Sequence, residues 1–300
     1  MLRSLGWRPF ALLFVVLGAC SREAQPPTVP TSPMAPGPSA PLGTVRLPQE
    51  QEPPPSGVDA SVHVALGIPR DADDSDDWLL DRELFVASYN PKLNAPNWVA
   101  WNLDDRYLGH APRSPGFHSD TGLPKTFYVV RDEDYVGSGY DRGHLCPSAD
   151  RTRDDAMNKA TFVFTNAHPQ FHELNAGPWE KLETHERELA RQGKELYIVA
   201  GGIFDSEPTR IGRAKDVGRR VAVPRASYKI IVVLDRGQDA RAVRADTKVI
   251  AAIMPNTREP KLHEWTDYAV SIREVERATG YDFLARVPRD VQDLIETRTP

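Results

Sequence analysis

The chain has 300 residues, of which 40% are hydrophobic and 26% charged, and this composition excludes wholesale disorder. The net charge of -5 excludes a uniformly basic coat for nucleic acid but leaves room for a local basic groove. Two cysteines exclude a disulfide-dense scaffold.

Residues 1–19 predict an export signal, because two arginines precede an apolar stretch that is too short to span a bilayer. The stretch ends Leu-Gly-Ala before Cys20, and this resembles a bacterial lipobox. The resemblance implies that Cys20 is lipidated, so the protein is a lipoprotein without a transmembrane helix. Ser21 after the cysteine favours the outer membrane, on its periplasmic or cell-surface side. A plain secretory signal is the alternative, and it also exports the protein.

Residues 20–57 predict a tether, since eleven prolines lie between Ser21 and Gly57. Such a segment favours extended polyproline II and acts as a semi-rigid spacer. A proline-rich ligand for another protein is the alternative. The folded domain is then residues 58–300, and its one cysteine, Cys146, leaves no partner for a disulfide within it.

Eight short apolar or β-branched runs predict strands. They are His63–Ile68, Leu84–Tyr89, Asn97–Asn102, Thr126–Arg131, Thr161–Thr165, Leu196–Gly201, Tyr228–Leu234 and Thr247–Met254. Residues 71–77 between the first two runs are strongly acidic and predict a solvated loop. A calcium site is the alternative, although the spacing fits no EF-hand loop.

Three helices are predicted, over Pro178–Gln192, from Ser271 to Gly280 and over Pro288–Thr297. Proline suits a first helical position and glycine the position after the last turn. Ser271 with Glu274 forms a capping-box pattern. Strands outnumber helices without regular alternation, which predicts an α+β fold with a central, mostly antiparallel sheet flanked by helices.

The sequence Asp141-Arg142-Gly143-His144 places a carboxylate, a guanidinium and an imidazole within four positions. His144 is a candidate general base because imidazole titrates near neutrality. Gly143 allows a backbone shape that other residues resist. The structural alternative is an Asp–Arg pair beside a core histidine.

A second group of polar residues follows on the predicted helix. Asn175 lies just before the helix, Glu183 eight residues later, and Arg187 four residues beyond Glu183 on the same helical face. Glu183 lies near enough to share an ion site with Asn175. Hard divalent ions prefer oxygen ligands, and magnesium keeps several of its waters.

These two motifs, in this order, resemble the DNA/RNA non-specific endonuclease family, the Serratia-type nucleases with a ββα-metal finger. The resemblance covers residues 85–285. It implies a metal-dependent endonuclease that hydrolyses DNA and RNA without sequence specificity and leaves 5′-phosphate ends. It also implies Mg²⁺ as the cofactor, with Mn²⁺ as a possible substitute.

The resemblance also implies roles for particular residues. His144 corresponds to the general base that activates water, Asn175 to the direct magnesium ligand, and Glu183 to a carboxylate acting on the ion through water. The residues implied to contact the substrate phosphate are Arg113, Arg142 and Arg187. Asp141 and Gly143 correspond to structural positions of the finger.

Residues 208–248 hold eleven basic and four acidic residues. Since binding without sequence specificity rests on backbone charge, this segment predicts part of a basic wall beside the cleft. A solvated face unrelated to substrate is the alternative.

Two other functions stay open. His144, Cys146, His168 and His172 could form a zinc site. The protein could also be a catalytically inactive nucleic-acid-binding surface module, although His144, Asn175, Glu183 and Arg187 are all present.

Overall fold

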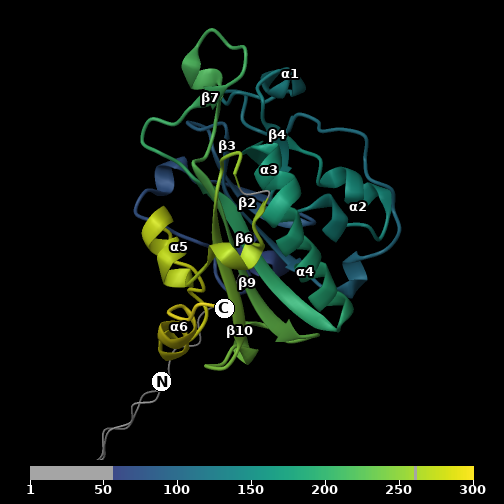
Figure 1. The fold of residues 1–300 in the computed structure, drawn as a ribbon, viewed down its shortest axis with the longest axis vertical. Coiled ribbons are helices and arrows are strands. Elements are labelled where there is room, and N and C mark those ends of the chain that lie inside the picture. The colour runs from purple at the N-terminus through teal and green to yellow at the C-terminus, as the bar shows by residue number, and fades with distance from the viewer. Residues whose placement is uncertain (1–56, 260–261) are drawn as a thin grey trace, which may run out of the picture. The chain divides into compact units, whose positions relative to one another are not determined.

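The computed structural model describes residues 57–259 and 262–300 (Figure 1). The predicted signal segment, Cys20 and all but the last residue of the tether lie outside the described residues. In the described ranges, every helix is too short or too polar to cross a bilayer.

A seven-stranded antiparallel sheet forms the centre of the domain, in the order β1-β2-β3-β6-β9-β10-β11. Its strands are β1 (Trp78–Arg82), β2 (Phe85–Asn90), β3 (Ala95–Leu103), β6 (Lys194–Ile203), β9 (Ala226–Asp235), β10 (Lys248–Pro255) and β11 (Ala269–Val270). Five of the eight predicted strands belong to this sheet, and the α+β prediction is confirmed.

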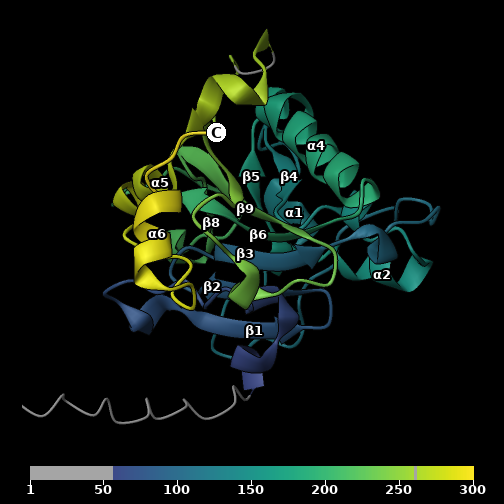
Figure 2. The same cartoon turned by 90° about the horizontal axis from the view of Figure 1, so that it is seen from below.

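Both faces of the sheet are covered, as the view in Figure 2 shows. Successive side chains of a strand point to opposite faces, so on β3 Val99 and Trp101 enter one core while Trp98 and Ala100 enter the other. Strand β3 is consequently buried along its whole length. Because both faces of the central strands are buried, their sequences are continuous apolar runs.

Helices pack on both of these faces. They are α1 (Asp132–Tyr135), α2 (Asp155–Ala160), α3 (His172–Leu174), α4 (Glu180–Arg191), α5 (Ile272–Thr279) and α6 (Arg289–Ile295). Leu182 and Leu189 of α4 pack into the core that contains Trp101, whereas Ile272 of α5 and Ile295 of α6 pack into the core that contains Trp98.

The predicted capping box and both glycines after helices are confirmed, whereas Pro178 is not the first residue of α4 as predicted. Ser271 and Glu274 form the reciprocal capping box of α5, and Gly280 ends that helix in the left-handed region with φ of 86°. Gly193 follows α4 with φ of 84°. Pro178 lies inside a π-helical turn, Asn175–Trp179, that leads into α4.

Three predicted strands are wrong. His63–Ile68 contains a 3-10 turn, Val62–Val64, that packs on the sheet. Thr126–Arg131 has no strand partner among the described residues, and side chains such as Phe127 pack on the core beneath it. Thr161–Thr165 contributes a single bridge, from Val163 to His118. Strand propensity needs a neighbouring strand to pair with, and these segments meet side chains instead.

Two small hairpins complete the fold. Strand β4 (Asp141–His144) pairs antiparallel with β5 (Ala167–Gln170), and α3 and α4 follow directly, so the chain forms a two-strand-plus-helix unit. Strand β7 (Arg210–Ile211) pairs with β8 (Val221–Ala222).

Candidate active site

His144 ends strand β4 and is buried, with 6% of its surface exposed. Its ring lies between two phenylalanines, 4.5 Å from the Phe117 ring centre and 4.7 Å from that of Phe162. Burial, assisted by the charge of Arg113, lowers the pKa of His144 to about 3. The imidazole is therefore neutral at physiological pH.

The Nε2 atom of His144 is buried and has no hydrogen-bond partner among the described residues. Buried polar atoms are nearly always paired, so an unpaired ring nitrogen needs an explanation. A nitrogen kept free to accept a proton is such an explanation. The backbone of His144 is also fixed, because the Trp179 indole donates to the His144 carbonyl oxygen at 3.3 Å.

Asn175 lies at the junction of α3 with the π-helical turn. Its Nδ2 donates to Asp141 Oδ2 at 3.0 Å, and the His172 Nδ1 lies 2.9 Å from the same oxygen. Because the amide nitrogen is fixed on Asp141, the amide oxygen is turned away from Asp141, and it accepts no hydrogen bond from the residues that the structure describes. The sequence predicts a structural role for Asp141, and in the structure Asp141 orients the Asn175 side chain.

Glu183 and Arg187 lie one turn apart on α4. Arg187 pairs with the buried Asp150, Nη1 to Oδ1 3.2 Å, and its Nη2 donates to Thr184 Oγ1 at 3.0 Å. Burial raises the pKa of Glu183 to about 7, against the opposing charges of Lys229 and Arg187. A cation bound beside Glu183 would favour its ionised form.

The two remaining arginines approach from other segments. Arg142 on β4 pairs with Asp132 of α1, Nη2 to Oδ1 2.6 Å. Arg113 donates from Nη1 to Ser148 Oγ at 2.8 Å, and its guanidinium carbon lies 4.9 Å from the Phe162 ring centre.

One cavity of about 300 Å³ brings these side chains together. The sequence-predicted residues that line it are Arg113, Arg142, His144, Asn175, Glu183 and Arg187. A neighbouring cavity of about 370 Å³ is lined by Asp141 and Asp132 and shares Arg113, Arg142 and Asn175 with the first. Gly143 belongs to β4 and lines neither cavity. A neutral base, carboxamide and carboxylate oxygens and three guanidinium groups thus surround one space.

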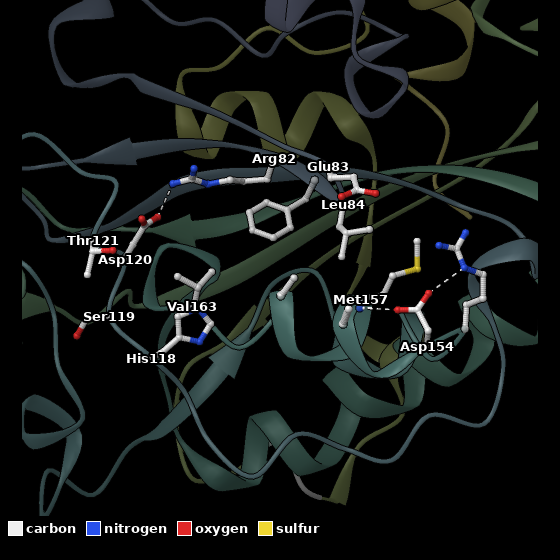
Figure 3. Close-up of a pocket in the computed structure, with 14 residues that line it drawn as sticks. Arg82, Glu83, Leu84, His118, Ser119, Asp120, Thr121, Asp154, Met157 and Val163 are labelled. Carbon is white, nitrogen blue, oxygen red and sulfur yellow. Dashed lines mark hydrogen bonds and ion pairs between the residues drawn. The ribbon is translucent and has the colours of Figure 1, made fainter.

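The larger cavity of Figure 3, about 490 Å³, shares no lining residue with these two. Its floor is apolar, with Leu84, Met157 and Val163, and the Arg82–Asp120 ion pair lies at one end. Size alone does not identify the site, because the groups suited to proton transfer and anion binding lie around the smaller cavity.

The donor set around the smaller cavity fits a hard, mostly hydrated divalent ion, because Asn175 and Glu183 both offer oxygen and the space admits water. The zinc alternative does not fit. His168 bonds Ser227 and His172 bonds Asp141, while Cys146 is buried without a disulfide. Within the described ranges, no three His, Cys, Asp or Glu side chains are grouped to hold a metal.

No residue of the segment 208–248, which is predicted to form part of a basic wall beside the cleft, lines either of these two cavities. Part of the segment is strand β9, where Lys229 is fully buried. Other members pair locally, as Arg225 does with Asp205 and Arg236 with Asp105.

Sequence reasoning missed the residues that support the site. Asp150, Ser148, Lys229 and Glu186 contact the predicted residues or the helix that bears them. Asp150 and Ser148 follow the Asp-Arg-Gly-His motif closely, and that proximity is the one signal that could have marked them.

A hairpin and helix that hold a buried histidine, an asparagine, a glutamate and three arginines around one cavity, on an antiparallel sheet, define a phosphodiester-hydrolysing nuclease. The sequence model of the DNA/RNA non-specific endonuclease family matches residues 68–290. The chain belongs to this family, whose members typically use a divalent metal.

Relatives and solved structures agree with the assignment. The chain is 42% identical over 244 residues to a nuclease of Nostoc sp., covering 79% of this chain and 86% of that protein. It is 34% identical over 206 residues to the mitochondrial nuclease EXOG of Danio rerio, covering 66% of this chain and 58% of that protein. A crystal structure of the EndoG/EndoGI complex matches with a TM-score of 0.63 and 25% identity, covering 76% of this chain and 91% of that one.

Proposed function

We propose that this nuclease is an exported, lipid-anchored enzyme that uses Mg²⁺ to cleave DNA and RNA and leaves 5′-phosphate ends. His144 is its general base, Asn175 holds the ion directly, and Glu183 holds it through water. One observation carries the proposal: the unpaired, buried Nε2 of His144 belongs to a side chain that lines the same cavity as Asn175 and Glu183.

The chain's own residues account for most of the reaction. His144 accepts a proton from a water molecule as the water oxygen bonds to phosphorus and the bond to the 3′-oxygen breaks. The imidazole is neutral at the start, and the negative phosphate stabilises the imidazolium that forms. Arg113, Arg142 and Arg187 offer guanidinium forks that match the phosphate oxygens. A bound Mg²⁺ would supply Lewis-acid stabilisation of the departing oxygen.

Digestion of supercoiled plasmid DNA and of RNA, with Mg²⁺ and with EDTA, tests the proposal. His144→Ala should lower kcat by about 10²- to 10⁴-fold in a protein that still folds, as circular dichroism at the assay temperature checks. Arg289→Ala is the matched control, because Arg289 is an exposed arginine on α6. Wild-type protein that binds DNA without cutting it would instead identify an inactive binding module. Enzymatic labelling of the product ends shows whether they are 5′-phosphates.

The identity of the ion is tested separately through Asn175. Asn175→Ala should raise the Mg²⁺ concentration needed for half-maximal cleavage by roughly tenfold or more, because a water that replaces the amide oxygen does not bind the ion to the chain. Mn²⁺ is titrated in parallel to measure whether it substitutes. An unchanged Mg²⁺ titration would remove Asn175 from the ion site.

The lipid anchor rests on the Leu-Gly-Ala-Cys20 sequence. Several acyl chains hold a protein stably at a membrane, whereas a single chain holds it weakly. Cys20→Ser should move the protein from the membrane fraction to the soluble fraction while its specific activity stays the same. Retention of the serine variant in the membrane would overturn the anchor.

A further inference from the structure

Arg113 lies on a stretch with neither helix nor strand, between residues 108 and 131, yet its side chain is held from two directions. Its Nη1 donates to Ser148 Oγ at 2.8 Å, and its guanidinium lies over the Phe162 ring at 4.9 Å. Ser148 is 3% exposed, so the acceptor oxygen belongs to a fixed part of the structure.

A single amide joins the Arg113 segment to the Ser148 segment. Asn158 of α2 is 1% exposed. Its Oδ1 accepts from the Ser114 backbone N–H at 2.8 Å, and its Nδ2 donates to the Ser148 carbonyl oxygen at 2.8 Å. The backbone next to Arg113 and the backbone of its hydrogen-bond acceptor are therefore set by one side chain.

Asn158 is itself fixed by the helix that bears it. Asp154 caps α2 by accepting from the Met157 backbone N–H at 2.9 Å, and Met157 packs into the core. Other residues of this segment line the cavity of Figure 3, where Met157 and Asp154 are drawn. A series of contacts thus connects the core to Arg113 through α2 and Asn158, and it includes neither His144 nor the residues proposed to hold the ion.

The charge of Arg113 also differs from that of the other two site arginines. Arg142 pairs with Asp132 and Arg187 with Asp150, so a carboxylate offsets part of each charge. Among the ion pairs of the described residues, none includes Arg113, and the group that fixes it is a neutral hydroxyl. Arg113 therefore keeps its full charge for an anion in the cavity.

We propose that Ser148 and Asn158 are positioning residues that hold Arg113 as the principal anchor for the substrate phosphate; this rests on the proposed function of the cavity. Ser148 sets the direction of the guanidinium, and Asn158 sets the spacing between the two segments. Neither residue takes part in proton transfer.

A double-mutant cycle tests the proposal on the full chain. Binding of a fluorescent DNA duplex is measured by anisotropy in EDTA, and KM and kcat are measured in Mg²⁺. Ser148→Ala and Asn158→Ala should each raise Kd and KM about three- to tenfold. In an Arg113→Ala background the same substitutions should change Kd less than twofold, because the group that they position is gone.

Ser119→Ala is the matched control, since Ser119 Oγ also makes a 2.8 Å hydrogen bond, to the Val130 carbonyl oxygen, away from the site. It should leave Kd and KM unchanged. Equal effects of Ser148→Ala with and without Arg113 would overturn the proposal, as would unchanged binding in both single variants. If Asn158→Ala does not fold, the Ser148 cycle decides. Wild-type protein that binds DNA but does not cleave it would contradict the proposed function. The Kd values of the double-mutant cycle would still test whether Ser148 and Asn158 position Arg113.

Discussion

The Lys229 ammonium lies 3.1 Å from the Glu186 carboxylate, and neither side chain is exposed to solvent. The ammonium also lies over the Trp179 ring at 4.4 Å and the Trp101 ring at 5.4 Å. Since the Trp179 indole donates to the His144 carbonyl oxygen, the ion pair joins β9 to α4 beside the strand that bears the candidate base.

Lys229→Met should lower the free energy of unfolding by about 3–5 kcal/mol, because the Glu186 charge is left buried without a partner. The double variant Lys229→Met, Glu186→Leu should recover most of this loss, since it removes both charges and keeps apolar volume. Urea unfolding followed by circular dichroism measures both. A single variant as stable as wild type would show that the pair does not hold α4 on the sheet.

Three buried histidines predict how stability changes with acid. Burial lowers the pKa of His63 to about 4 and the pKa values of His144 and His168 to about 3. Unfolded histidine titrates near ~6.5, so between the two values the unfolded chain binds more protons. The free energy of unfolding should therefore fall as pH drops below ~6.5, by about 1.4 kcal/mol per pH unit for each histidine.

Urea unfolding of the metal-free protein between pH 4.5 and 7.5 checks the slope. His168→Gln should reduce the slope by one proton, because glutamine can still bond Ser227 but does not titrate. His110→Gln is the control, since His110 is exposed. Equal slopes in wild type and His168→Gln would show that His168 is protonated in the folded protein.

Much of the site could be predicted from the sequence because its residues are local. Asp141 to His144 form one strand, and Asn175, Glu183 and Arg187 belong to one helical segment, so spacing alone places each group. The buried partners could not be predicted in this way. Glu186 and Lys229 are 43 residues apart, and the sequence places Lys229 in a basic segment that predicts a wall at the surface and not a buried ion pair.

The central strands were predictable for a similar reason. Strands β6, β9 and β10 are buried on both faces, and this produces continuous β-branched runs. Thr126–Arg131 has the same composition, but its neighbours in space are side chains and not another strand. Composition shows that a segment is apolar, and the tertiary fold decides how deeply it is buried and whether its backbone is paired.

The Arg142–Asp132 ion pair predicts a gain of affinity. Asp132 is 57% exposed and lines the cavity next to the candidate base, so its carboxylate competes with substrate phosphate for the guanidinium. Asp132→Asn should lower KM for DNA about two- to fivefold at low salt, and the gain should shrink as salt screens the charge. Steady-state cleavage at several salt concentrations measures it.

Asp205→Asn is the matched control, because Asp205 pairs with Arg225 in a similar exposed setting away from both cavities. It should leave KM unchanged. A higher KM in Asp132→Asn would mean that Asp132 holds Arg142 in its working position and does not compete with the substrate.

The structure gives a reason for glycine at position 143 that differs from the reason predicted from the sequence. The sequence suggests that glycine is needed for an unusual backbone shape, but Gly143 is not among the residues with positive φ and forms part of strand β4. A Cβ at this position would lie 2.1 Å from Gln170 Oε1 and 2.4 Å from its Cδ. Gln170 is fully buried and donates to Ser227 at 3.1 Å, so it has little freedom to move.

Gly143→Ala should therefore lower the free energy of unfolding by about 1–3 kcal/mol through overpacking, and should reduce cleavage because His144 is the next residue. In a Gln170→Ala background the same substitution should cost much less, since the colliding side chain is absent. Urea unfolding of the four proteins measures the difference. An equal loss of unfolding free energy in both backgrounds would mean that position 143 needs glycine for its backbone conformation, because that requirement does not depend on the Gln170 side chain.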